Sequence, residues 1–172
     1  MTIHSPGHSA LPLTLDFAGL ANILPLAPST VQKNVSRSPS SLPPHIKVGG
    51  KQKPIWMTQI SLAWNSDPSM STPIILDLRE FPPILDSFQL ASILHISESS
   101  IDSMYYRFPS SLPPRGVYGW VTHDVFKWLV KGLIGLPATA RVEIKAPVFL
   151  LYQVPVRRTL ANDLSSLRRG ER

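Results

Sequence analysis

Side chains that could carry out catalysis or hold a metal ion are few in this chain. His4 and His8 are spaced to share a metal ion, but no third ligand accompanies them. His123 and Asp124 are adjacent, yet they fall at the start of an expected helix, where an acidic residue is favoured without any catalytic role. Cysteine is absent, and the sequence holds no metal-binding helix motif, phosphate-binding loop or nucleophile elbow. We therefore expect no enzyme, no cofactor, no bound metal and no small-molecule substrate.

A second group of side chains is suited to hydrogen bonding and ion pairing with a polar partner. It falls on an expected short helix over residues 29–37, whose apolar positions Val31 and Val35 are four apart and face inward. Beyond this helix, a Gly49-Gly50 turn is flanked by lysines. The outward candidates are Ser29, Thr30, Gln32, Lys33 and Arg37 on the helix, Asn34 at the edge of its polar face, and Lys47, Lys51 and Lys53 around the turn.

Helices and a hairpin must position these candidates. Asp16 can cap a first helix, in which apolar residues recur at helical spacing through residues 17–24. Pro25 ends that helix and the second one follows after a short turn, so the two form a helix-turn-helix unit. Residues 45–57 are expected to form a β-hairpin, and Thr58 is expected to be the N-cap of a third helix.

A six-residue stretch occurs twice and divides the chain into two similar modules. Pro-Ser-Ser-Leu-Pro-Pro stands at residues 39–44 and again at residues 109–114, with an apolar first helix upstream of each copy. Two tryptophans follow each copy in the same order, Trp56 and Trp64, then Trp120 and Trp128. The shared order of these matches predicts an internal duplication. We place module 1 at residues 13–64 and module 2 at residues 83–131.

Module 2 repeats the plan with a different surface. Ser97 is expected to cap its second helix, and Tyr105 is expected to face inward. Its turn is shortened to residues 115–119, and Thr122 is expected to cap its last helix. The outward candidates are Ser99, Ser100, Ser103, Tyr106 and Arg107 on the second helix and Arg115 before the short turn.

The remaining segments are a flexible tail (1–12), a linker (65–82) that holds one possible strand, and a C-terminal extension (132–172) of strands followed by a basic tail. Residues 138–156 alternate in polarity and then become apolar. This segment could pack across the two modules or pair with another chain, so a homo-oligomer is possible. The expected fold class is therefore α+β, mainly helical, with two tandem modules plus a C-terminal strand segment and basic tail.

Composition and charge narrow the class of protein. The hydrophobic content of 43% predicts a packed core, and 18 prolines predict short helices and many loops. Module 1 carries five Lys or Arg against one Asp, whereas module 2 carries four basic residues against four acidic ones. Solubility alone would account for the mild overall charge of +6. No apolar run is long enough to cross a bilayer and no secretory leader is recognised, so we expect a cytoplasmic protein without a membrane partner.

The order of these elements resembles the AlpA/excisionase group of MerR-like winged helix-turn-helix domains. That group combines an apolar first helix, a Pro-containing corner, a Gly-Gly wing, a tryptophan that closes the wing and a third helix that ends in tryptophan. The matching residues are Leu42-Pro43-Pro44, Gly49-Gly50, Trp56 and Trp64 in module 1, and Ser97, Leu112-Pro113-Pro114, Trp120 and Trp128 in module 2. Module 1 has Ala27 where the group favours Ser, and module 2 lacks the Gly-Gly wing.

The resemblance implies a sequence-specific double-stranded DNA-binding protein without enzymatic activity. Such proteins act as transcriptional regulators or as recombination and excision accessory factors of mobile elements, plasmids or phages. The second helix would enter the major groove, where Gln32 and Asn34 could pair with adenine, and Lys33 or Arg37 with guanine or phosphate. The wing lysines would contact phosphates or the minor groove. Two modules could occupy half-sites about 10 bp apart.

Two other interpretations stay open at this point. In the first, module 1 binds DNA while module 2 and the C-terminal strands mediate oligomerisation or protein assembly, which the balanced charge of module 2 favours. In the second, the whole protein is an adaptor with no DNA role. An adaptor's affinity would be nearly independent of salt, whereas DNA binding through several Lys and Arg contacts falls steeply as salt rises.

Overall fold

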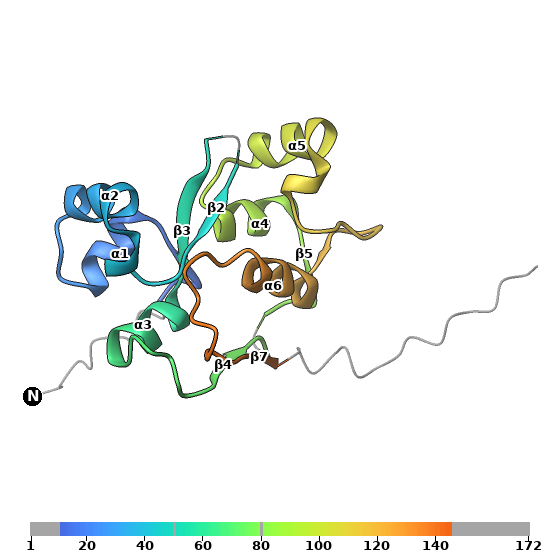
Figure 1. The fold of residues 1–172 in the computed structure, drawn as a ribbon. Coiled ribbons are helices and arrows are strands. Elements are labelled where there is room, and N and C mark those ends of the chain that lie inside the picture. Colours follow the sequence, from blue (N-terminus) through green and yellow to red (C-terminus); the bar gives the residue numbers. More distant parts are fainter. Residues whose placement is uncertain (1–10, 50, 80, 146–172) are drawn as a thin grey trace, which may run out of the picture.

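Two short helices at the start of the chain form the predicted helix-turn-helix unit. The computed structural model describes residues 11–49, 51–79 and 81–145 (Figure 1). The helix α1 (Phe17–Ile23) begins at Asp16, whose carboxylate accepts the backbone N–H of Gly19 at 2.8 Å. The helix α2 (Pro28–Arg37) follows with proline in its first turn, where the missing N–H is not needed. Leu20 and Val31 are fully buried between the two helices and Trp56.

Module 1 continues through a hairpin into a third helix, as predicted. A short 3-10 helix, η1 (Pro39–Ser41), leads to the strands β2 (Ile46–Val48) and β3 (Lys53–Met57), which α3 (Thr58–Ser66) follows directly. The strand β1 (Thr14–Leu15) completes a three-stranded antiparallel sheet in the order β1-β3-β2. The whole unit therefore has the order of a winged helix-turn-helix module.

Module 2 repeats these elements without the counterpart of β2. Its elements are β5 (Ile84–Leu85), α4 (Ser87–Leu94), α5 (Glu98–Arg107), η2 (Pro109–Ser111), β6 (Trp120–Val121) and α6 (Thr122–Lys131). Leu85 pairs with Trp120 in the β5–β6 ladder just as Leu15 pairs with Trp56 in the β1–β3 ladder. The predicted α+β class with two tandem modules is confirmed.

Two threonines expected to be N-caps have another role. Thr58 and Thr122 are the first residues of α3 and α6, and neither helix has a side-chain cap. Each threonine hydroxyl instead donates to a carbonyl oxygen just before the module's first strand, on Pro12 and Pro82 respectively. The N-cap prediction was wrong because it considered only the local sequence, while these hydroxyls join the two ends of each module.

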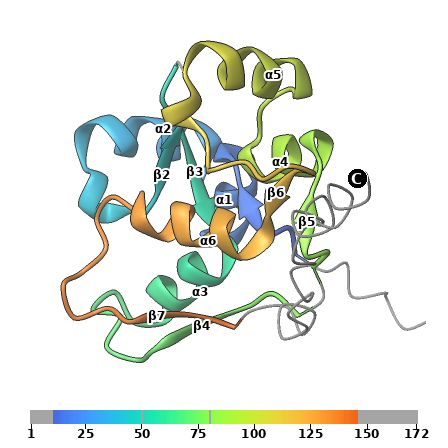
Figure 2. The same cartoon turned by 90° about the vertical axis from the view of Figure 1, so that its right-hand side faces the viewer.

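The hairpin and α3 of module 1 share a hydrophobic core with module 2, whereas α1 and α2 pack in a separate cluster. The hairpin residues Ile46, Val48 and Ile55 are buried in the same cluster as Leu90 of α4 and Phe126 of α6. In Figures 1 and 2 the hairpin accordingly stands beside α4 and α5 of module 2. Folding of the hairpin is therefore coupled to module 2.

Polar contacts also cross between the two modules. The hydroxyl of Thr14 donates to the carbonyl of Ile93 at 2.6 Å, from β1 to α4. His45, just before β2, exchanges two backbone hydrogen bonds with Ile134, which follows α6. These contacts tie the start of module 1 to module 2, and the middle of module 1 to the segment just after module 2.

A parallel pair of strands closes the base of the molecule. The expected linker contains β4 (Ile74–Asp77), which pairs in parallel with β7 (Val142–Lys145) of the C-terminal extension. Part of the segment considered for pairing with another chain thus pairs within this one (Figure 2). Residues 146–156 of that segment, the basic tail and residues 1–10 of the expected N-terminal tail lie outside the described residues. Within the described ranges, no helix is long and apolar enough to cross a membrane.

Gly119 allows β5 and β6 to approach closely at the short turn of module 2. Its φ is +144°, and a Cβ atom at this position would lie 2.4 Å from the carbonyl oxygen of Leu85. We expect Gly119→Ala to lower the free energy of unfolding by about 3 kcal/mol. The new Cβ atom would clash with the backbone of β5, which cannot move away as a flexible side chain could. Gly135 has φ +83° with open space around it, so Gly135→Ala should cost only about 1 kcal/mol. Urea denaturation of both variants measures the difference, and equal costs would contradict this assignment.

The first tryptophan after each Pro-Pro corner is anchored differently in the two modules. Trp120 is buried and its indole N–H donates to the carbonyl of Pro113 at 3.2 Å. The guanidinium of Arg115 lies over the Trp120 ring at 4.9 Å. In module 1 the imidazole of His45 occupies the equivalent place, tilted against Trp56 with ring centroids 5.9 Å apart. The Pro-Pro corner therefore positions a ring or a guanidinium against each core tryptophan.

His45 should make the fold sensitive to acid. Burial lowers its pKa below the ordinary value of 6.5, and the nearby Lys47 ammonium lowers it further. The unfolded chain then binds a proton more readily than the folded one, so stability is complete above pH 6.5 and falls as the pH drops below it. We expect His45→Gln to show a smaller loss of unfolding free energy between pH 7 and pH 5 than the wild type, measured by urea denaturation. Parallel pH profiles for the two proteins would contradict this account.

Candidate nucleic-acid interface

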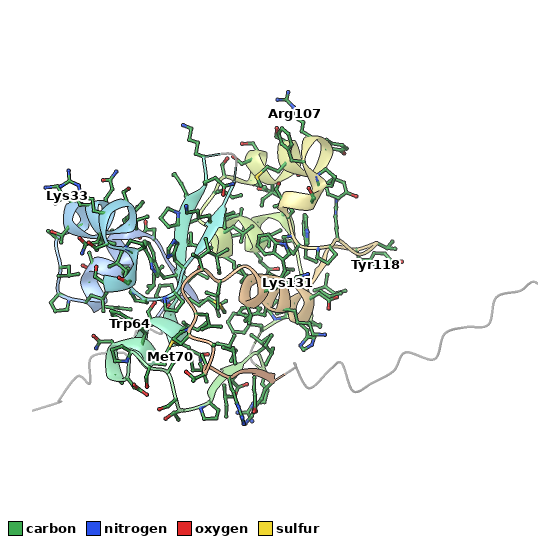
Figure 3. All side chains as sticks on the ribbon, viewed as in Figure 1. Lys33, Trp64, Met70, Arg107, Tyr118 and Lys131 are labelled. Carbon is green, nitrogen blue, oxygen red and sulfur yellow. The ribbon has the colours of Figure 1, made fainter. Side chains whose placement is uncertain are left out.

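The helix α2 presents most of its polar candidates to solvent. Val31 is completely buried against module 1 and fixes the rotation of the helix. The side chain of Lys33 points away from the body of the molecule (Figure 3). Ser29, Gln32, Lys33 and Arg37 are exposed, whereas Thr30 and Asn34 are half-buried. Because α2 has no acidic residue, this face is positively charged.

The hairpin carries its three lysines on exposed positions. Lys53 pairs with Val48 across the hairpin, and Lys51 lies in the turn between the strands. Lys47 lies between two buried residues of β2 and, with Lys131, lines a separate groove beside η2. The hairpin from β2 to β3 contains no acidic residue, so its outer end is basic as well.

The helix α5 presents the candidates of module 2. Ser97 is its N-cap and accepts the backbone N–H of Ser100, as predicted. Tyr105 was expected to face inward, but it is exposed because Met104 fills the core position beside it. Ser99, Ser103, Tyr106 and Arg107 are exposed, and Ser100 is half-buried.

A groove forms where the hairpin of module 1 meets α5 of module 2. Its volume is about 530 Å³, and Lys51 and Lys53 line it together with Ser100 and Ser103. Four of the predicted site residues, two from each module, are therefore brought together. Further lining residues, not proposed from the sequence, are Val48, Gly49, His95, Ile96, Ser97 and Met104.

Arg115 is held in place by aromatic rings. Its guanidinium lies 4.8 Å from the ring centre of Tyr105 and 4.9 Å from that of Trp120. Tyr105 in turn makes an edge contact with Tyr106, with ring centres 5.5 Å apart. This arrangement fixes the start of the short turn in module 2, so Arg115 contributes to the structure of the module whether or not it binds a partner.

Together, α2, the hairpin and α5 form an edge of the molecule. The hairpin projects between the two helices, and β4 and β7 lie at the opposite end (Figures 1 and 2). Lys33 and Arg107 extend from this edge on either side of the hairpin (Figure 3). Amide, hydroxyl and cationic groups arranged along an edge can hydrogen-bond to base edges and neutralise phosphates.

The catalytic and metal candidates do not converge with other such groups. His123 and Asp124 are half-buried residues of the first turn of α6, and the Nδ1 atom of His123 is closed to solvent. Among the residues that the structure describes, no three His, Cys, Asp or Glu side chains are placed to hold a metal ion. His4 and His8 lie outside the described residues. Comparisons with protein-family models, with curated proteins and with solved structures found no match.

Proposed function

We propose that this protein binds double-stranded DNA along the edge formed by α2, the β2–β3 hairpin and α5. One observation carries the proposal: α2 and the hairpin lie along one edge of the molecule (Figure 1), both carry exposed basic residues, and neither element contains an acidic residue. An α-helix fits the major groove, and a basic hairpin beside it is suited to the flanking backbone. The protein is then a non-enzymatic cytoplasmic DNA-binding protein.

The reading helix of this proposal is α2. Gln32 is exposed and can form a bidentate pair with adenine, whereas the half-buried Asn34 is less free to reach a base. Arg37 can pair with guanine and Lys33 with a phosphate. The buried Val31 fixes which of these side chains reach the groove.

The biological role that fits these features is a small regulator or a recombination accessory factor of a mobile element, plasmid or phage. The support is the similarity of both modules to the AlpA/excisionase group in the helix-turn-helix unit and the buried Trp56 and Trp120, together with the hairpin of module 1. Two modules in one chain present two helices that could read successive turns of a duplex, about 10 bp apart.

A direct binding experiment tests the proposal. Fluorescence anisotropy of a labelled mixed-sequence duplex of about 30 bp should report binding, because phosphate contacts do not require a specific sequence. Selection and sequencing of bound genomic fragments would then give the target site. The absence of duplex binding at low salt would refute the proposal.

A second candidate assigns module 2 to protein assembly. It is favoured by two nearly fully exposed apolar side chains at the short turn, Val117 (89%) and Tyr118 (87%), and by the exposed Tyr106 on α5. Tyrosine is enriched at protein interfaces, and module 2 carries no net charge to attract phosphates. The turn reaches away from the body of the molecule (Figure 3). Loss of self-association in Tyr118→Ser, measured by analytical ultracentrifugation, would support this role.

A further inference from the structure

We propose that the groove between the hairpin and α5 is a phosphate site in which one strand of the duplex crosses from module 1 to module 2. This inference rests on the proposed function and deepens it, since it assigns a DNA contact to module 2. The groove is built by both modules at once, with lysines on the hairpin side and hydroxyl groups on the α5 side.

The walls of the groove suit an anion with several oxygen atoms. Lys51 and Lys53 supply ammonium groups, and Ser97, Ser100 and Ser103 supply hydroxyl groups at successive turns along α5. Hydrogen bonds in which a cation donates to phosphate oxygen are roughly twice as strong as neutral ones. The groove can therefore neutralise a phosphate and hydrogen-bond to it.

The charges around the groove support the same ligand. Module 2 has no net charge, but the acidic residues of α5, Glu98 and Asp102, are not among the residues that line the groove. Lys51 and Lys53 of module 1 are therefore the Lys, Arg, Asp or Glu residues that line the groove itself. Neutrality of module 2 as a whole does not prevent a phosphate contact at this place.

His95 adds an observation independent of the lysines. It lines the groove at the end of α4, and its Nε2 atom is closed to solvent without a hydrogen-bond partner in the described part of the chain. Its backbone is left-handed, with φ of +51°, which fixes its position between α4 and α5. Because this nitrogen is closed to solvent in the unbound protein, the His95 side chain would have to turn toward the groove before the nitrogen could hydrogen-bond to a phosphate oxygen there.

The geometry of B-DNA explains why a strand should cross here. A helix lies in a major groove and a hairpin beside it follows the adjacent minor groove, so the next helix meets the following major groove. A phosphate backbone separates each minor groove from the major groove beside it. With α2, the hairpin and α5 in this order along the edge, that backbone passes between the hairpin and α5 (Figure 1).

Ser100→Glu in the full-length protein tests the site. Ser100 is three residues after the N-cap Ser97, so a glutamate there completes a capping box and should preserve α5, while its carboxylate repels phosphate from the groove. The matched control is Gln59→Glu, which adds the same charge to the exposed first turn of α3. We expect Ser100→Glu to weaken duplex binding by at least about tenfold relative to Gln59→Glu.

Inorganic phosphate separates the possible sources of the anion. In NMR titrations at constant ionic strength, phosphate should shift the amide signals of residues 51–53 and 97–104 in the wild type but not in Ser100→Glu. Equal duplex affinity of Ser100→Glu and Gln59→Glu would overturn the strand crossing, and phosphate shifts in that case would assign the groove to a free phosphorylated molecule. Absent shifts would overturn the phosphate site itself. Failure of the wild type to bind duplex would instead refute the proposed function.

Discussion

Residues 13–64, produced as a separate polypeptide, should fail to fold although they form a complete winged helix-turn-helix module in sequence. Ile46, Val48, Ile55, Met57 and Ile60 are each no more than 2% exposed and belong to the cluster shared with module 2. Exposing such a side chain costs about 1.5–3 kcal/mol. Exposing all five would lower the free energy of unfolding by on the order of 10 kcal/mol. This loss is comparable with the whole stability of a small domain, about 5–15 kcal/mol.

Circular dichroism and urea denaturation would measure this result. The fragment should show little helical signal and no cooperative transition, while the full chain unfolds in a cooperative transition. A cooperative transition of the fragment would show that module 1 is an independent domain, and would contradict the shared core.

Replacement of Lys51 and Lys53, two of the three hairpin lysines, should have the largest effect on DNA binding. We expect Lys51→Gln combined with Lys53→Gln to weaken duplex binding roughly 50-fold in about 0.1 M salt. Each lost phosphate contact reduces the number of counterions that DNA releases on binding, and this release favours binding. Both side chains are exposed, so the change should leave the fold unaffected. Fluorescence anisotropy with a labelled duplex measures the affinity.

A charge-matched variant provides the control for this prediction. Arg141→Gln combined with Lys145→Gln removes the same charge beside and within β7, at the end of the molecule opposite the hairpin (Figure 2). Its affinity should change by less than about threefold, since exposed charges beyond a Debye length of about 10 Å are largely screened. Equal losses in the two variants would mean that total charge, and not this edge, governs binding.

Local sequence signals predicted the elements of each module well. Asp16 and Ser97 are the N-caps of α1 and α5, and the outward face of α2 follows from the buried Val31. The repeated Pro-Ser-Ser-Leu-Pro-Pro stretch marked equivalent positions in the two modules. Its first three residues form η1 in one copy and η2 in the other, and a buried tryptophan follows each copy. These features depend on contacts within a few residues, which the sequence pattern records directly.

Contacts between distant segments could not be predicted in this way. The parallel pairing of β4 with β7 joins residues about seventy positions apart, and no local pattern specifies such a partner. The hydroxyls of Thr58 and Thr122 were assigned to caps because the carbonyls that they reach lie 46 and 40 residues away. The shared core was missed for the same reason, since an apolar hairpin face does not show what covers it.

The sequence indicated which residues could form the candidate site, but not that residues of the two modules would meet in one groove. The lysines of the hairpin and the serines of α5 were proposed separately, as parts of two different modules. Their meeting in a groove follows from the packing of the hairpin against module 2, and His95 joins them through the left-handed turn at the end of α4. No spacing in the sequence marks this residue.

The salt dependence of duplex binding tests the central proposal most directly. The logarithm of the binding constant should fall linearly with the logarithm of salt concentration, with a slope about 1.8 shallower for the Lys51→Gln, Lys53→Gln variant than for the wild type. Binding that is nearly independent of salt, or equal slopes for the two proteins, would contradict DNA recognition through this edge.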